Sequence, residues 1–320
     1  MWDRHADHVL GSYASFLRGR RLSLDNAGGF SGALLWKIES GVGSLCLRAS
    51  SPSESPRHLA DRHHLMALAR DRGMTFVPRV HRNAEGNTVS IHAGRAWELM
   101  EWLPGSASYQ EHPTQTKLTA AVVALARLHR EWASGKTRIL AECPAVERRI
   151  RAWKRHMESS PGILPLAASD LYQRIQAHLN RWLVRVPEIL GKPAASLRVH
   201  PCLRDIWHDH LLFTGEELTG LVDYAGVGED NPAVDLARML GSLCGDDEDA
   251  WEFALAHYRE MGDLTGEEAR LARRLDQSGV ILALANWRTR LEEMAENKVG
   301  FAPKLVSRVE SLLARVDRWK

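Results

Sequence analysis

The chain has 320 residues, of which 44% are hydrophobic and 26% charged, enough for one large or two moderate globular domains. Its net charge of +2 gives no reason to expect a nucleic acid or an anionic membrane surface as partner. No run of about 18 apolar residues occurs, so no membrane-spanning helix is expected.

The four cysteines lie far apart and form neither a zinc-site spacing nor a C-x-x-C motif. In a chain of this length, such isolated cysteines are typical of reduced, buried thiols. The first 20 residues lack the charged and then apolar layout of a signal peptide. We therefore expect a cytoplasmic protein, and the sequence leaves the oligomeric state open.

The first hundred residues are rich in predicted strands. Apolar residues at helical spacing predict two helices in this part, over residues 8–17 and 61–72. Five segments have the composition of strands: residues 34–38, 44–48, 76–80, 89–91 and 96–102. The first two of these flank a glycine turn and predict a β-hairpin.

The composition changes at Pro104-Gly105, after which helical patterns dominate as far as residue 197. Three amphipathic helices are predicted there, over residues 118–132, 146–157 and 169–184. Helices resume at Ala233. The fold class is therefore α+β with two lobes, a small β-rich lobe over residues 1–102 and a larger, mainly helical lobe over residues 103–320. A cleft between two lobes is the default ligand site.

Residues 203–223 are the most informative stretch. They place Asp205 and Asp223 beside two short apolar runs that are joined by a turn at Thr214-Gly215. Phosphoryl-transfer enzymes use one carboxylate as the base for the attacking hydroxyl and another as a ligand of Mg²⁺. This pattern predicts a reaction as well as a local structure.

Three motifs, taken in order, make the chain resemble the aminoglycoside phosphotransferase and choline kinase-like family, small-molecule kinases with the protein-kinase fold. Residues 203–213 read L-R-D-I-W-H-D-H-L-L-F, where the family has H-G-D-L-x-x-x-N and an apolar pair. Residues 219–226, T-G-L-V-D-Y-A-G, look like its G-[VL]-I-D-[FW]-G. Residues 230–238, D-N-P-A-V-D-L-A-R, resemble its G-D-P-x-x-D-L-A.

The resemblance implies a role for each charged residue of these motifs. Asp205 would be the catalytic base, and Arg204 beside it would help to balance charge near the transferred phosphate. Asp223 would hold Mg²⁺, a hard cation that prefers oxygen ligands. Asp235 would be a structural anchor that accepts backbone N–H bonds from the catalytic loop.

The nucleotide side of the site is implied by weaker matches. A glycine-rich turn would cover the phosphates with its backbone N–H groups, a cation at the end of the following strand would pair with them, and the connector before Pro104-Gly105 would bind adenine. The implied ATP-binding residues are Gly28, Gly29, Phe30, Ser31, Gly32, Arg48, Glu101, Trp102 and Leu103.

His210 departs from the family pattern, because it stands where the family has asparagine as a second metal ligand. Histidine is a poor match for Mg²⁺. It could ligate weakly, leave Asp209 to supply an oxygen, bind zinc together with His208, or hydrogen-bond within the loop. Anchoring the motif on residues 200–202 instead would put Cys202 at the catalytic position, so that register is rejected.

A second departure concerns the partner of Arg48. The family has a glutamate on the helix before Gly73, whereas this chain offers Asp61 and then Arg62, His63 and His64. We favour Asp61 as the anchor that pairs with Arg48, although a shift of one residue would bring Arg62 there.

The predicted function is an ATP- and Mg²⁺-dependent phosphotransferase that acts on a hydroxyl group of a small molecule. The alternative is a catalytically weak or inactive pseudokinase that binds a nucleotide or a small ligand in a regulatory role, since a fold does not guarantee its usual activity. The sequence does not identify the acceptor.

Overall fold

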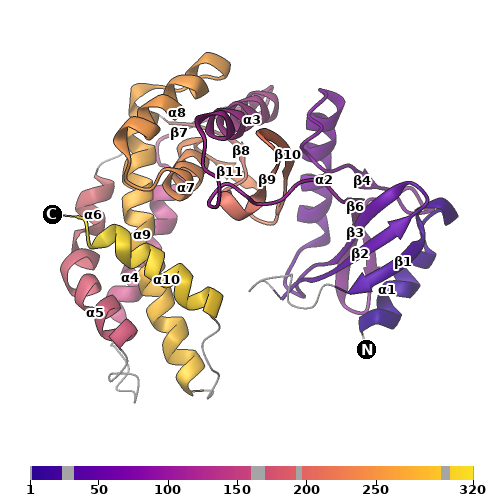
Figure 1. Cartoon of the computed structure of the whole chain (residues 1–320), viewed down its shortest axis with the longest axis horizontal. Coiled ribbons are helices and arrows are strands. Elements are labelled where there is room, and N and C mark those ends of the chain that lie inside the picture. The colour runs from indigo at the N-terminus through magenta and orange to yellow at the C-terminus, as the bar shows by residue number, and fades with distance from the viewer. Residues whose placement is uncertain (1, 24–31, 160–169, 192–196, 297–302, 320) are drawn as a thin grey trace. The chain divides into compact units, whose positions relative to one another are not determined.

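The computed structural model describes residues 2–23, 32–159, 170–191, 197–296 and 303–319 (Figure 1). By their packing they form two compact units. The first contains residues 1–132 and 207–227, and the second contains residues 133–206 and 228–320. The fold is mixed α+β, as predicted, with an antiparallel sheet near the N-terminus and a helical C-terminal region.

The first unit is built on an antiparallel sheet in the order β1-β2-β3-β6-β4, with β5 also paired to β6 (Figure 1). These strands are Gly19–Ser23 (β1), Leu34–Ser40 (β2), Gly43–Ala49 (β3), Val80–His81 (β4), Ser90–His92 (β5) and Arg95–Glu101 (β6). The unit also contains α1 (Trp2–Gly11), a 3-10 turn (Ser15–Leu17), α2 (Pro56–Asp71) and most of α3 (Gln115–Ala133). Its second sheet is the hairpin of β9 (Leu211–Thr214) and β10 (Glu217–Leu221), which follows a 3-10 turn (His208–His210).

Alternation along β3 decides which side chains reach the apolar core. Leu45, Leu47 and Ala49 are fully buried and join α1, β2 and β6 in one hydrophobic cluster. Trp36 and Trp97 stack within this cluster with ring centroids 5.3 Å apart. Because successive side chains of a strand point to opposite faces, the same pattern directs Arg48 away from the core.

The hairpin belongs to the first unit because it is bonded to the connector and to the β-rich part. Ser106 and Phe213 exchange backbone hydrogen bonds of 3.0 and 2.8 Å. Gly105 makes this approach possible: its φ is +96°, and a Cβ there would lie 2.5 Å from Thr219 Oγ1. The backbone N–H of Leu221 also donates to the carbonyl of Phe76. The division predicted at residue 102 therefore falls inside a packed unit.

The second unit is organised around α9, a helix of 31 residues against which α4, α5, α6, α7 and α10 pack. Its helices are α4 (Pro144–Glu158), α5 (Asp170–Trp182), α6 (Val186–Leu190), α7 (Ala233–Leu243), α8 (Glu248–Met261), α9 (Gly266–Glu296) and α10 (Pro303–Val316). A small antiparallel sheet has the order β11-β8-β7, from Gly228–Asp230, Leu197–Cys202 and Arg138–Leu140.

The predicted elements differ from the structure in three ways. The helix expected over residues 8–17 is α1 followed by a separate 3-10 turn, because the chain leaves the helix after Gly11. Only Val80 of the strand expected over residues 76–80 is in β4, since the preceding residues turn, with Val77 N–H bonded to the Met74 carbonyl. Strands β1, β7, β8 and β11 were not predicted.

Among the described residues, no helix combines the length and the apolar composition needed to cross a bilayer.

Candidate active site

In the first unit, the strand cation Arg48 is bound by a carboxylate from the neighbouring strand. Arg48 on β3 lies directly opposite Glu98 on β6 in the antiparallel register, and Arg48 Nη1 is 2.7 Å from Glu98 Oε1. The other oxygen, Glu98 Oε2, is 2.6 Å from Nε2 of His63 on α2. The side chains of Glu98 and His63 are 4% and 2% exposed.

This network sets the charge of its members. Although burial alone would raise it, the hydrogen bond from His63 and the charge of Arg48 lower the pKa of Glu98 to about 2. Burial would lower the pKa of Arg48, but the charge and hydrogen bond of Glu98 and the charge of Asp223 raise it. Both carboxylates thus favour the charged form of Arg48.

The prediction that Asp61 pairs with Arg48 is wrong, because the carboxylate that pairs with Arg48 in the structure is that of Glu98. Asp61 is exposed on α2, whereas its neighbours Arg62 and His63 are buried. Helical geometry explains the difference, since residues one position apart point about 100° away from each other. Glu98 was missed because its place opposite Arg48 depends on the register of β3 with β6 and is not marked by the sequence of either strand.

Asp223 follows the hairpin in a backbone conformation that is uncommon outside glycine and that aspartate adopts more readily than most residues. Its φ is +64°, in the left-handed region, and its Oδ1 accepts a hydrogen bond from Ala225 N–H at 3.2 Å. Its side chain is 48% exposed. Left-handed backbone in a residue other than glycine costs free energy and is concentrated at functional sites. An exposed carboxylate is thereby held at the hairpin end, with oxygen donors of the type that Mg²⁺ prefers.

His210 lies beside Asp223, but its nearer nitrogen is already engaged. Trp207 Nε1 donates a hydrogen bond of 2.8 Å to His210 Nε2, which is 3.7 Å from Asp223 Oδ2. Because an indole N–H is only a donor, Nε2 must contribute its lone pair to this bond. A metal role for His210 through Nε2 would require this hydrogen bond to break. Asp209, the alternative oxygen donor, is 3.4 Å from His208 Nε2.

The connector residues predicted to bind adenine are Glu101, the last residue of β6, and the two residues after it. The N–H of Glu101 donates to the carbonyl of Arg79, and that of Trp102 to the carbonyl of Ser44. Leu103, which is 5% exposed, makes no backbone hydrogen bond through its N–H to the described part of the chain. That the Leu103 amide binds adenine stays a prediction. Of the predicted glycine turn, Gly28, Gly29, Phe30 and Ser31 lie outside the described residues, and Gly32 is exposed just before β2.

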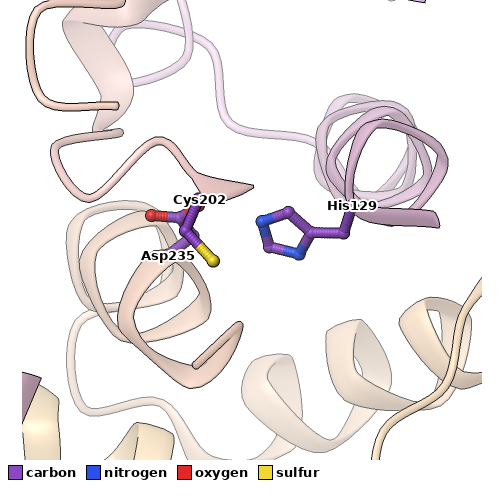
Figure 2. Close-up of side chains that lie close together, drawn as sticks. All are labelled: His129, Cys202 and Asp235. Carbon is purple, nitrogen blue, oxygen red and sulfur yellow. The ribbon is translucent and has the colours of Figure 1, made fainter. Parts of the chain in front are cut away.

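In the second unit, the loop that carries Asp205 is tied to α7. The carboxylate of Asp235 accepts the N–H groups of Leu203 and Arg204 at 2.7 and 2.5 Å, one on each oxygen. Asp235 is fully buried, and one of its carboxylate oxygens lies within 4.8 Å of the sulfur of Cys202 at the end of β8 (Figure 2). These bonds hold the backbone immediately before Asp205.

Arg204 and Asp205 themselves differ in exposure. Arg204 has a φ of +64°, and its guanidinium lies against Gly228, where a Cβ would be 2.7 Å from the guanidinium carbon. Burial and the neighbouring Arg148 lower the pKa of Arg204. Asp205 is 54% exposed, and its Oδ1 is 2.8 Å from Nη2 of Arg238 on α7. The predicted base is therefore exposed to solvent, and the backbone just before it is bound by the buried carboxylate of Asp235.

Residues 25–273 match the profile of the phosphotransferase enzyme family. The chain belongs to this family. The match covers most of the chain and includes all three motifs of residues 203–238. It supports the fold and family that the sequence motifs implied.

Curated relatives and solved structures agree with this membership. Homoserine kinase from Nitrobacter winogradskyi is 24% identical over 200 residues, which are 61% of this chain and 57% of the relative. Homoserine kinase from Beijerinckia indica is 24% identical over 68% of this chain and 64% of the relative. The chain thus spans between about half and two thirds of the length of these relatives.

Among solved structures, an aminoglycoside phosphotransferase from Alicyclobacillus acidocaldarius has a TM-score of 0.64 at 14% identity, covering 97% of this chain and 92% of that one. A spectinomycin phosphotransferase in complex with ADP and spectinomycin has the same TM-score at 13% identity, covering 98% of each chain. At this identity the likeness concerns the fold.

Proposed function

We propose that this protein is an ATP- and Mg²⁺-dependent kinase that transfers a phosphoryl group to a hydroxyl of a small molecule. The observation that carries the proposal is the pair of exposed aspartates, each on a constrained backbone: Asp205 follows the backbone held by Asp235, and Asp223 follows the hairpin with a φ of +64°. Phosphoryl transfer needs little more from a protein than such placed charges. Family membership supports the same reaction class.

Each residue has a role that follows from its surroundings. Asp205, exposed and unobstructed by burial, orients the acceptor hydroxyl and takes its proton. Asp223 is the oxygen ligand for Mg²⁺, which when bound neutralises charge on the nucleotide phosphates. Arg48 supplies a fixed positive charge for those phosphates, and Leu103 offers its N–H to adenine. The protein contributes positioning and electrostatic stabilisation.

The acceptor class is suggested by the relatives. Two of the proteins that resemble this chain are homoserine kinases, and a solved structure with the same fold is an aminopropanol kinase. Homoserine and short amino alcohols are therefore the first acceptors to test, followed by aminoglycosides and choline. The test is an acceptor screen with ATP and Mg²⁺ on the wild type and on Asp205→Ala, with ADP release as the readout. Acceptor-dependent turnover that the Asp205→Ala variant retained in full would contradict the assignment.

A second function is favoured by one observation. His210 replaces the asparagine of the family motif, and its Nε2 is bound by Trp207. A pseudokinase that binds nucleotide without metal would need no second ligand there. Nucleotide titration with and without Mg²⁺ separates the two functions: binding that is equally tight without Mg²⁺, together with no ATP turnover on the whole acceptor panel, would favour the pseudokinase.

A further inference from the structure

Helix α2, on which we expected Asp61 to be the acidic partner of Arg48, carries two consecutive buried polar residues. Arg62 and His63 are 4% and 3% exposed, while Asp61 and His64 on either side of them are exposed. Burying a cation and an imidazole is costly unless both have partners. Their partners therefore indicate what α2 does in this unit.

Among the described residues, the hydrogen-bond partner of His63 is the carboxylate of Glu98. With Glu98 ionised, both of its oxygens are acceptors, so the proton of the 2.6 Å contact lies on His63 Nε2. His63 Nδ1 is buried and makes no hydrogen bond in the described part of the chain. A structural histidine normally satisfies both nitrogens. The unsatisfied Nδ1 is a cost that the contact with Glu98 must offset.

Glu98 in turn has one oxygen for each neighbour. Its Oε1 faces Arg48 Nη1 at 2.7 Å, and its Oε2 faces His63. The carboxylate is therefore clamped from two sides, which leaves its Arg48-facing oxygen in one position. Because Arg48 and Glu98 are register partners on adjacent strands, the guanidinium is held over the same face of the sheet.

Arg62 connects the same helix to the segment that carries Asp223. Its Nη1 donates to the carbonyl of Tyr224 at 3.3 Å, and its Nη2 is 3.3 Å from Glu54 Oε2. Adjacent residues of α2 thus contact the partner of Arg48 and the residue that follows Asp223. A displacement of α2 would move both groups.

We propose that Glu98 and His63 are the positioning residues of the nucleotide-phosphate cation Arg48, with the acid supplied by strand β6 and fixed by an imidazole from α2. This inference rests on the proposed function, because it assigns Arg48 to the phosphates. It concerns how the cation is aimed. Neither Glu98 nor His63 needs to contact the substrate, so both act through Arg48.

The experiment compares the affinity of ADP with that of adenosine, both measured by calorimetry with Mg²⁺ present. The ratio isolates the contribution of the phosphate groups from that of adenine binding and from general loss of structure. The variants are Glu98→Gln and His63→Gln, with Arg48→Gln setting the full size of the effect. The matched controls are His64→Gln, exposed on the same helix, and Glu39→Gln, an exposed carboxylate of the same sheet that pairs with Lys37.

We expect Glu98→Gln and His63→Gln to lower the ADP-to-adenosine ratio by about tenfold, as for loss of one well-placed charged contact, while the controls leave it unchanged. A ratio equal to that of the wild type in either variant that retains the wild-type Tm overturns the inference. If Glu98→Gln does not fold, His63→Gln decides, because it leaves the Arg48–Glu98 pair intact.

The proposed function and this inference fail in different ways. A wild type that binds ADP but phosphorylates no acceptor contradicts the kinase assignment and leaves the positioning result to stand. A wild type that binds no ADP contradicts both. ADP binding with unchanged ratios in the variants contradicts the inference alone.

Discussion

The first unit holds Glu98 as a buried carboxylate, 4% exposed and bound on both oxygens, whereas the second unit presents Asp205 with 54% of its side chain exposed. Glu98 has its pKa lowered to about 2 by His63 and Arg48 against the effect of burial. Arg238, the partner of Asp205, is itself 41% exposed. A carboxylate that positions another side chain, as we propose for Glu98, is most effective when it is buried and hydrogen-bonded on both oxygens. A carboxylate that takes a proton from a substrate, as we propose for Asp205, must be accessible to that substrate.

The largest effects should separate the two exposed aspartates. We expect Asp205→Asn and Asp223→Asn each to lower kcat by about 10³-fold, since each removes one charged group that the reaction needs. Only Asp223→Asn should abolish the gain in ADP affinity that Mg²⁺ produces, because Asp223 is the proposed oxygen ligand. Steady-state rates and ADP titrations with and without Mg²⁺ measure both. Loss of the Mg²⁺ effect in Asp205→Asn would break the division of roles.

Asp235 should matter for the stability of the catalytic loop. Asp235→Ala leaves the N–H groups of Leu203 and Arg204 without their acceptors and should lower the free energy of unfolding by about 3 kcal/mol. Asp235→Asn retains one acceptor and should cost less. Urea denaturation checks the order, with Asp249→Ala, an exposed aspartate on α8, as control. Equal stability of Asp235→Ala and the control would show that the loop is held by other contacts.

Glu98 should produce a stability difference that depends on pH. Its folded pKa of about 2 lies below the ordinary value of 4.5, so its contribution is present above pH 4.5 and is lost as the pH falls towards 2. The shift corresponds to about 3 kcal/mol. The difference in stability between the wild type and Glu98→Gln should therefore shrink over this interval. A difference that is constant from pH 6 to pH 2.5 would mean that Glu98 is not clamped as an ion.

Arg238 provides a smaller effect at the exposed carboxylate. Arg238→Gln removes the charge that holds Asp205 Oδ1 at 2.8 Å, and we expect kcat to fall by about tenfold with an unchanged affinity for ADP. The control is Arg270→Gln, an exposed arginine of α9 that pairs with Glu267 on the same helix. An altered ADP affinity with unchanged kcat would place Arg238 on the nucleotide side instead.

The smallest effect concerns His210. His210→Asn introduces an amide oxygen that suits Mg²⁺ better than an imidazole and removes the acceptor of Trp207. We expect the Mg²⁺ concentration for half-maximal rate to fall about threefold, measured by Mg²⁺ titration at saturating ATP. An increase would show that His210 takes part in the site as it stands.

Much of this arrangement could be predicted from the sequence. The two apolar runs between Asp205 and Asp223, joined by a turn, predicted the hairpin, because strand and turn preferences are local. The resemblance to the family likewise implied a cation at Arg48, at the end of a predicted strand. The resemblance to the family rested on the same part of the chain, because residues 203–238 contain the motifs with the predicted catalytic and metal-binding aspartates.

Only the tertiary structure decided which residues meet. Glu98 and Arg48 are 50 positions apart, and their facing depends on the register of β3 with β6, which no local pattern specifies. On α2, Asp61 was expected to pair with Arg48, but the rotation of the helix buries Arg62 and His63 and leaves Asp61 exposed to solvent. Local sequence therefore determined the motifs and their elements, and the register of strands and the rotation of one helix determined the partners of the charged groups.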